Sequence, residues 1–242
     1  MDWYARLMEC WNDPIFDKYR GRCYGMFCQG SQNHENLVTE DSDMDVVAII
    51  LPTKLELATC AKPVSIELLR DNDEHIKVWD YRKWIDLLKK SNFNAIELLY
   101  SKYSYINEDY KSYKGIHFKE IFAMREHIAH IDHVTFVKNI GGLAQSYYLK
   151  GREKANKNLR FYWSFLVKYL AGYSYLDCLT KDISELIGND LGPYSNEEYL
   201  KIINELVSYS LDTNHSKSEY VIDFLNNCAC NILEDMFVFE GD

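Results

Sequence analysis

Two short segments of the sequence carry residues that could do chemistry together. Gly30-Ser31 closes one apolar stretch, and Asp43-Met44-Asp45 opens the next. If the second stretch is a strand, Asp43 and Asp45 point to the same face, with their Cα atoms about 6–7 Å apart. Adjacent carboxylates repel each other unless cations lie between them, and carboxylate oxygens are ligands that suit Mg²⁺. The Asp-x-Asp segment is therefore a candidate site for one or two metal ions.

Gly30 and Ser31 have the chemistry of a phosphate contact. Gly30 has no Cβ atom, so a triphosphate could approach its backbone closely. Ser31 could offer its hydroxyl and its amide at the start of a short helix, which is a favourable place for phosphate. A lone Gly-Ser or a lone Asp-x-Asp is also a common surface feature, so the hypothesis depends on their combination.

The elements that position these residues follow from the periodicity of the sequence. Residues 22–29 and 43–51 are predicted strands, and the unbroken Val/Ile run of the second predicts burial on both faces. The segments 64–69 and 75–79 predict a hairpin around residues 70–74. A helix is predicted at 3–11, and the period becomes helical from Tyr81, with a second helical segment at 94–100.

Strand patterns nearly vanish after about residue 115. The remainder of the chain predicts helices at roughly 117–131, 133–150, 158–179, 196–211 and 217–238. We therefore expect an α+β protein. Residues 1–115 would form a mixed sheet with flanking helices, and residues 116–242 an all-α domain.

The order strand, Gly-Ser, short helix, Ser-Asp-x-Asp, strand resembles the signature of the DNA polymerase β nucleotidyltransferase superfamily. The string GSQNHENLVTEDSDMDVVAII is similar to its RNA-repair-associated and phage-encoded branch, and KVWDYRKWIDLLKKSNFNAIELLYSKYSYIN extends the likeness. The resemblance covers about residues 22–110. It implies a nucleotidyltransferase fold with Gly30 and Ser31 as nucleotide-binding residues. It also implies that Asp43 and Asp45 are catalytic residues that bind Mg²⁺ or Mn²⁺.

The sequence departs from the family pattern at two places in this region. Glu35-Asn36 replaces a glycine of the loop after Gly-Ser, and Asn36 could adopt the left-handed backbone instead. A third carboxylate is not obvious, because simple alignment puts His75 at its place. The candidates are Glu67, Glu74 and Asp80. Asp80 is preferred as the third catalytic acid because the Lys-x-x-Asp-x-Arg segment matches best there; the alternative is that Asp80 caps the helix that begins at Tyr81.

The most basic stretch of the chain is residues 150–160, with Lys150, Arg152, Lys154, Lys157 and Arg160. Family architecture implies a helical domain around Lys157, although the positions expected to hold His and Arg hold Phe161 and Ser164. Lys157 is therefore a candidate nucleotide-binding residue, expected to face the same cleft as Gly30 and to contact a triphosphate or an RNA end. The alternative is an exposed loop and helix start.

Three histidines lie close together in the sequence and are interpreted as a solvated helix face, with a zinc site as the minor alternative. His127, His130 and His133 follow one another at spacings of three, so neighbouring members could approach each other on a helix. The spacing nevertheless spreads His127 and His133 apart around the helix, which favours the solvated face.

Composition limits the class of protein. With 27 Lys and Arg against 37 Asp and Glu, the formal charge is −10, which excludes a general nucleic-acid coat. No segment reaches the roughly 20 apolar residues of a membrane span, and the N-terminus does not resemble a signal peptide. The cysteines number seven and form no Cys-x-x-Cys pair, so we expect buried thiols and a reducing, cytoplasmic setting.

The leading hypothesis is a Mg²⁺-dependent transfer of a nucleoside monophosphate from an NTP to an acceptor hydroxyl, an RNA end in the first instance, with release of pyrophosphate. A nucleotide-binding or interaction protein that has lost turnover is the first alternative, motivated by Glu35-Asn36 and the missing third acid. The second is a transferase that modifies a protein hydroxyl.

Overall fold

The computed structural model describes residues 2–33, 44–70, 74–110, 115–151, 155–184, 194–211 and 218–238. The chain divides into two compact units: residues 1–89, 94–128 and 219–242 form the first, and residues 90–93 and 129–218 form the second. This division differs from the expected boundary at residue 115, because the helix at 116–123 packs on the sheet through Phe118 and Phe122, and the helix at 219–238 packs on that helix.

The described residues of the first unit form a five-stranded mixed sheet, in the order β3-β4-β2-β1-β5. β2 is the central strand, pairing in parallel with β4 and antiparallel with β1, while the two edge strands, β3 and β5, are antiparallel to their neighbours. The strands are β1 (Cys23–Gln29), β2 (Asp45–Ile50), β3 (Ser65–Leu69), β4 (His75–Asp80) and β5 (Ser104–Ile106). The predicted strands and hairpin are confirmed; β5 was not expected.

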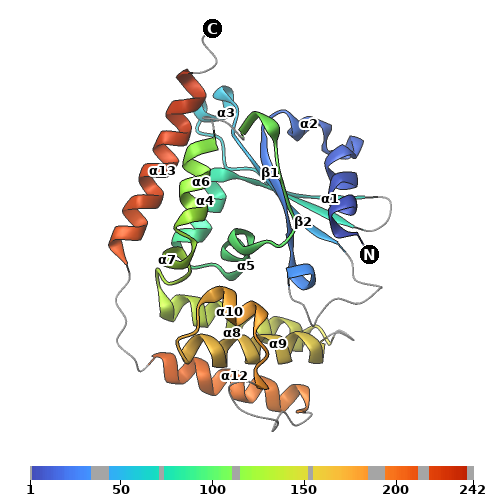
Figure 1. The fold of residues 1–242 in the computed structure, drawn as a ribbon, viewed down its shortest axis with the longest axis vertical. Helices are drawn as coiled ribbons and strands as arrows, with labels where there is room; N and C mark the ends of the chain where they lie inside the picture. Colours follow the sequence, from blue (N-terminus) through green and yellow to red (C-terminus); the bar gives the residue numbers. More distant parts are fainter. Residues whose placement is uncertain are drawn as a thin grey trace. The chain divides into compact units, whose positions relative to one another are not determined.

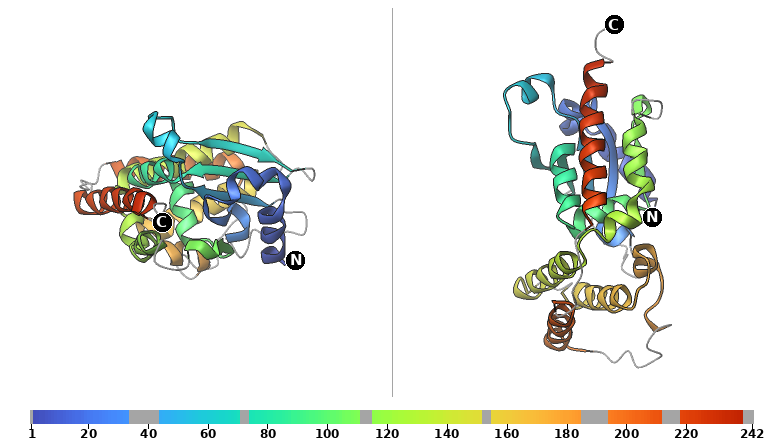
Figure 2. Two further views of the ribbon diagram at one scale, coloured as in Figure 1. Left: turned by 90° about the horizontal axis from the view of Figure 1, so that it is seen from above. Right: turned by 90° about the vertical axis from the view of Figure 1, so that its left-hand side faces the viewer.

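Both faces of the sheet are covered by helices (Figures 1 and 2). On one face, Val46, Ala48 and Ile50 of β2 belong to the same core cluster as Trp3 and Leu7 of the N-terminal helix α1 (Trp3–Asn12). Val47 and Ile49 alternate to the other face and are equally buried. This double burial explains why β2 is an unbroken apolar run.

Aromatic side chains fill the second face of the sheet. Phe27 of β1 stacks on Phe122, and Trp84 lies parallel to Phe118. These partners come from helices α4 (Tyr81–Lys89) and α6 (Ile116–Ala123), and α13 (Glu219–Val238) packs beside both of them (Figure 1). The other helices of this unit are α2 (Asp17–Arg20), α3 (Lys54–Ala58), α5 (Phe93–Glu97), which begins within the second unit, and α7 (Arg125–Ala129).

The described part of the second unit is helical, as the sequence predicts. Its helices are α8 (His133–Leu149), α9 (Ala155–Leu170), α10 (Tyr175–Thr180) and α12 (Asn196–Leu211). The stretch predicted as one helix at 158–179 is two helices, because the chain turns at Gly172, whose φ is +86°. Phe93 lies in a cluster of rings with Phe136, Phe165 and Tyr175.

The prediction of buried thiols holds for most of the cysteines, but Cys60 and Cys230 are exposed. All seven lie in the described ranges and none forms a disulfide, and five of them are buried. Burial raises the pKa of the Cys28 thiol to about 12, so this thiol stays protonated at neutral pH. Among the helices of the described ranges, none is long and apolar enough to cross a membrane.

Candidate functional site

The Gly-Ser segment forms a tight turn directly after β1. A 3-10 helix, η2 (Gly30–Asn33), begins where the strand ends, and Gly30 has a φ of +83°. A side chain is strained at this angle, which explains the glycine. A Cβ atom built on Gly30 would lie 3.7 Å from Oδ2 of Asp45, so the turn and the start of β2 are adjacent.

Asp45 begins β2 in the middle of a row of polar residues. It pairs in register with Gln29 at the end of β1 and with His75 at the start of β4. Its side chain is 45% exposed, and Nζ of Lys77 lies 3.3 Å from its Oδ1 atom. The same ammonium group lies 3.5 Å from Oε1 of Gln29. The structure thus brings Gly30 and Asp45 together at one end of the sheet, with Lys77 as the cationic partner of the acid.

Glu97 is a residue of this region to which the sequence motifs assign no role. Its carboxylate is buried and accepts a hydrogen bond from the backbone N–H of Gly30 at 2.9 Å. The signal was present in the sequence, because Glu97 begins the Glu-Leu-Leu-Tyr segment that extends the family resemblance. Nothing in the sequence, however, indicates that this acid contacts a turn 67 residues earlier.

The structure places Asp80 away from Asp45. Asp80 ends β4 and pairs with Ile50, whereas His75 at the other end of β4 pairs with Asp45. Five residues of strand separate these positions by about 17 Å. The expectation that Asp80 completes the metal site is therefore corrected: the parallel register of β2 and β4 puts it at the opposite end of the sheet.

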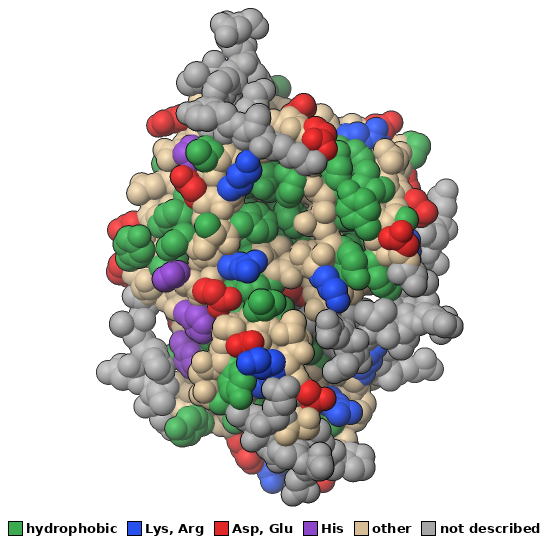
Figure 3. Space-filling view, viewed as in Figure 1, with side chains coloured by type: hydrophobic (Ala, Val, Ile, Leu, Met, Phe, Trp, Pro, Cys, Tyr) green, Lys and Arg blue, Asp and Glu red, His purple; other side chains and the backbone are tan. Residues whose placement is uncertain are grey.

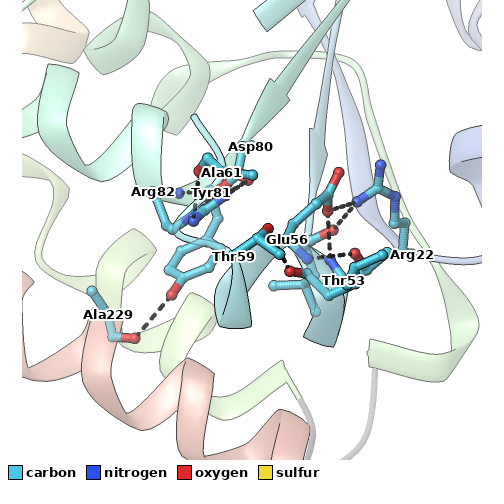
Figure 4. Close-up of polar contacts among 11 residues, drawn as sticks. Arg22, Thr53, Glu56, Thr59, Ala61, Asp80, Tyr81, Arg82 and Ala229 are labelled. Atoms are coloured by element: carbon cyan, nitrogen blue, oxygen red, sulfur yellow. Dashed lines mark hydrogen bonds and ion pairs between the residues drawn. The ribbon is translucent and has the colours of Figure 1, made fainter. Parts of the chain in front are cut away.

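Asp80 has the contacts of a structural acid (Figure 4). It is fully buried, and its carboxylate accepts hydrogen bonds from the backbone N–H of Arg82 at 2.9 Å and from Nη2 of Arg82 at 2.7 Å. These side-chain hydrogen bonds raise the pKa of the Arg82 guanidinium. The interpretation of Asp80 as the acid at the start of helix α4 agrees with this geometry.

The two other candidates for the third acid also have defined partners. Glu74 is buried and forms ion pairs with Arg6 and Arg70. Glu67 lies on the edge strand β3, where its carboxylate is 3.3 Å from Nδ1 of His75. Directly beside Asp45 on β4, at the place where alignment predicts an acid, the residue is His75.

Several predicted site residues lie outside what the structure describes. Asp43 falls in the undescribed range 34–43, together with Glu35 and Asn36; Ser31 is part of η2, but its side chain is not described. Lys157 lies on α9 in the second unit, so its relation to Gly30 stays a prediction.

The same holds for the proposed basic surface, because Arg152 and Lys154 are outside the described ranges. On the face drawn in Figure 3, the described Lys and Arg side chains are interspersed with Asp and Glu. The RNA contact therefore stays a prediction as well.

The described residues contain no cluster of three or more His, Cys, Asp or Glu side chains that could hold a metal ion. For the histidine candidate, the rings of His130 and His133 both stack on Tyr169, at centroid distances of 5.1 and 5.0 Å. These two histidines therefore take part in aromatic packing.

Comparison with known proteins gives one family. Residues 29–147 match the model of the RNA repair pathway DNA polymerase beta family (RlaP), which confirms the resemblance found in the motifs. A search of curated proteins gives no match. Among solved structures, a nucleotidyltransferase-like protein from Exiguobacterium sibiricum 255-15 is similar, with 10% identity over 86% of this chain and 72% of that one. The TM-score of this likeness is 0.29.

Proposed function

Starting from the match of residues 29–147 to the nucleotidyltransferase-like family of the polymerase β type, we propose that this protein transfers a nucleoside monophosphate from an NTP to an acceptor hydroxyl. The acceptor oxygen attacks the α-phosphorus, the bond to the β-phosphate oxygen breaks, and pyrophosphate leaves; the hydroxyl proton is lost to solvent. The observation that carries the proposal is the adjacency of the left-handed Gly30 turn and Asp45 at one end of the sheet.

The roles follow from the chemistry of each group. The turn at Gly30 and Ser31 receives the β- and γ-phosphates, and the charge of Asp45, with that of Asp43, is directed at a cation that accompanies them. Rate acceleration then comes mainly from positioning the two substrates and from neutralising charge. Lys157 is proposed as a further contact to the nucleotide.

The described residues fit a bound Mg²⁺ or Mn²⁺ in part. Asp45 offers a half-exposed carboxylate, and when an ion is bound there it would polarise a phosphate oxygen. The second ligand of the proposal, Asp43, is outside the described residues. On β4 the neighbour is His75, whose imidazole nitrogen is a ligand for transition metals rather than for Mg²⁺.

One experiment tests both the reaction and the acceptor. The protein is incubated with α-³²P-labelled NTPs, Mg²⁺ or Mn²⁺, and either total RNA or total protein, and the label is followed into each. We expect label in RNA with the wild-type chain and a loss of at least 100-fold with Asp45→Asn. Label in protein would instead support the protein-hydroxyl alternative. Equal transfer by wild type and Asp45→Asn would refute the proposed role of Asp45.

A second candidate function, nucleotide binding without turnover, is favoured by the surroundings of Asp45. His75 occupies the position beside it on β4, and Lys77 already lies 3.3 Å from its carboxylate. In this case wild type binds NTP but releases no pyrophosphate with either acceptor.

The variant His75→Asp then separates the two candidates. It places a second carboxylate beside Asp45, so it should increase affinity for divalent cations. If the missing acid is what prevents turnover, this variant should also gain pyrophosphate release. If the variant gains neither cation affinity nor pyrophosphate release, His75 is not the cause of the lost activity.

A further inference from the structure

The buried carboxylate of Glu97 is hydrogen-bonded to the Gly30 turn. Glu97 is the last residue of α5 and is 2% exposed. Its Oε1 atom accepts hydrogen bonds from the backbone N–H of Gly30 at 2.9 Å and from Nδ2 of Asn33 at 3.3 Å. One oxygen atom thus joins the first and the last residue of η2.

The local sequence does not explain an acid at this position. The chain continues from α5 directly into a 3-10 helix, η3 (Leu98–Tyr100), and Glu97 makes no side-chain capping hydrogen bond to it. A buried carboxylate is costly unless hydrogen bonds satisfy it. For Glu97, the hydrogen bonds from Gly30 and Asn33 supply part of that compensation. The hydrogen bonds to the Gly30–Asn33 turn therefore explain why an acid is located at position 97.

Neighbouring bonds tie the same turn to the segment around α5 and β5. Nδ2 of Asn33 also donates to the carbonyl of Cys28 at 3.0 Å, and the backbone N–H of Lys102 donates to Oδ1 of Asn33 at 3.0 Å. Just before the turn, Nε2 of Gln29 donates to the carbonyl of Asn94 at 3.0 Å. Among the side chains that make these hydrogen bonds, Glu97 is the acidic one, and it contacts Gly30, whose backbone is left-handed.

We propose that Glu97 is a positioning residue for the triphosphate: it fixes the Gly30–Asn33 turn in the conformation that binds the β- and γ-phosphates. This inference rests on the proposed function. It also changes the part assigned to Gly30. Because the Gly30 N–H donates to Glu97, Gly30 contributes its left-handed backbone and the absence of a side chain, and the phosphate oxygens must find other donors.

The test compares two substitutions that separate the acceptor oxygen from the rest of the side chain. Glu97→Gln keeps an oxygen that can accept from Gly30, whereas Glu97→Leu has a similar volume and no acceptor. Calorimetry with Mg²⁺ measures the affinity for the tightest-binding NTP and for its monophosphate. The readout is the ratio of these two affinities, because it reports the β- and γ-phosphate contacts and does not depend on the fraction of folded protein.

We expect Glu97→Leu to bind the triphosphate at least tenfold more weakly, with an unchanged affinity for the monophosphate, so that the ratio collapses. Glu97→Gln should keep a ratio within about threefold of wild type. If Glu97→Leu does not fold, Glu97→Asp replaces it, because a side chain shorter by one methylene withdraws the oxygen from Gly30.

Asp80→Asn is the matched control, since it changes another buried acid of the same unit at the other end of the sheet. It should destabilise the protein and leave the ratio unchanged. If wild type binds the triphosphate and Glu97→Leu keeps the wild-type ratio of triphosphate to monophosphate affinity, the inference is wrong. The proposed function is not affected by that result. A wild-type chain that binds none of the four NTPs overturns the proposed function itself, and the inference with it.

Discussion

The two ends of the β2–β4 pair each carry an acid, and the two acids are held in opposite ways. Asp45 is 45% exposed, and the ammonium group of Lys77 lies 3.3 Å from one of its oxygens. Asp80 is fully buried and accepts hydrogen bonds from both the backbone and the guanidinium of Arg82 (Figure 4). The residue type and the strand pair are the same, but the surroundings differ.

This difference separates a structural acid from one that can take a ligand. A buried carboxylate contributes to stability when its acceptors are filled, and leaving its partner unpaired is costly. A half-exposed carboxylate contributes little to stability. Because it is exposed, its oxygens are accessible to a cation. The type of the residue does not distinguish the two cases; the number and quality of its partners do.

The Asp80 end is strengthened further by a helix cap. Thr53 and Glu56 form a reciprocal capping box at the start of α3, and Glu56 also pairs with Arg22 at 2.5 Å (Figure 4). Tyr81 donates from its hydroxyl to the carbonyl of Ala229, which links α4 to α13. Hydrogen bonds and ion pairs therefore stabilise this end of the sheet, in contrast to the exposed end at Asp45.

The largest effect is expected for Asp80→Asn. Removing the charge takes away the hydrogen-bonded counter-charge of the Arg82 guanidinium, whose side chain is 21% exposed, and this should lower the free energy of unfolding by roughly 2 kcal/mol. Urea denaturation measures this change. Nucleotide affinity of the folded variant should equal that of wild type. If Asp80→Asn is as stable as wild type but has no activity, Asp80 is a catalytic residue and its structural role is wrong.

A smaller effect is expected for Glu56→Gln. Burial alone would raise the pKa of Glu56, but hydrogen bonds from the Thr53 backbone and from Arg22 outweigh it and lower this pKa below its usual 4.5. The stabilisation is therefore present above about pH 4.5 and is lost as the pH falls through the folded-state pKa. At pH 7 the variant should be less stable by roughly 1 kcal/mol.

The pH dependence of that difference is the measurement. Unfolding free energies of wild type and Glu56→Gln, determined at intervals from pH 7 to pH 3, should converge at the acidic end. A constant difference across this range would show that the charge of Glu56 does not contribute.

The smallest change in stability is expected for Lys77→Met at the Asp45 end. An ion pair this exposed contributes little, so the free energy of unfolding should change by less than about 0.5 kcal/mol. Removing the competing ammonium should, however, increase the affinity for Mn²⁺ about fivefold, corresponding to about 1 kcal/mol. Paramagnetic titration of Mn²⁺ measures this affinity.

Lys89→Met is the matched control, because Lys89 carries the same charge but contacts Asn226 on α13. It should leave the affinity for Mn²⁺ unchanged. If both variants change the affinity equally, the effect comes from the net charge, and Lys77 has no specific part in it.

The sequence by itself determined the strands and part of the site. The apolar run of β2 predicts a strand buried on both faces, and the Gly-Ser and Asp-x-Asp segments predict a turn and an acid at neighbouring strand ends. These features are local, because side-chain alternation and the left-handed preference of glycine act within a few residues. For this reason the sequence predicts the roles of Gly30 and Asp45, and it predicts the helices at 133–150 and 196–211.

Tertiary structure alone decided which residues accompany that acid. The parallel register of β2 and β4 puts His75 beside Asp45 and sends Asp80 to the opposite end, although both lie on one strand. Glu97 reaches Gly30 across 67 residues of chain, and α13 returns from the C-terminus to pack on α4. Register and long-range contacts depend on how separate segments pack against one another, and no periodicity within a single segment encodes them.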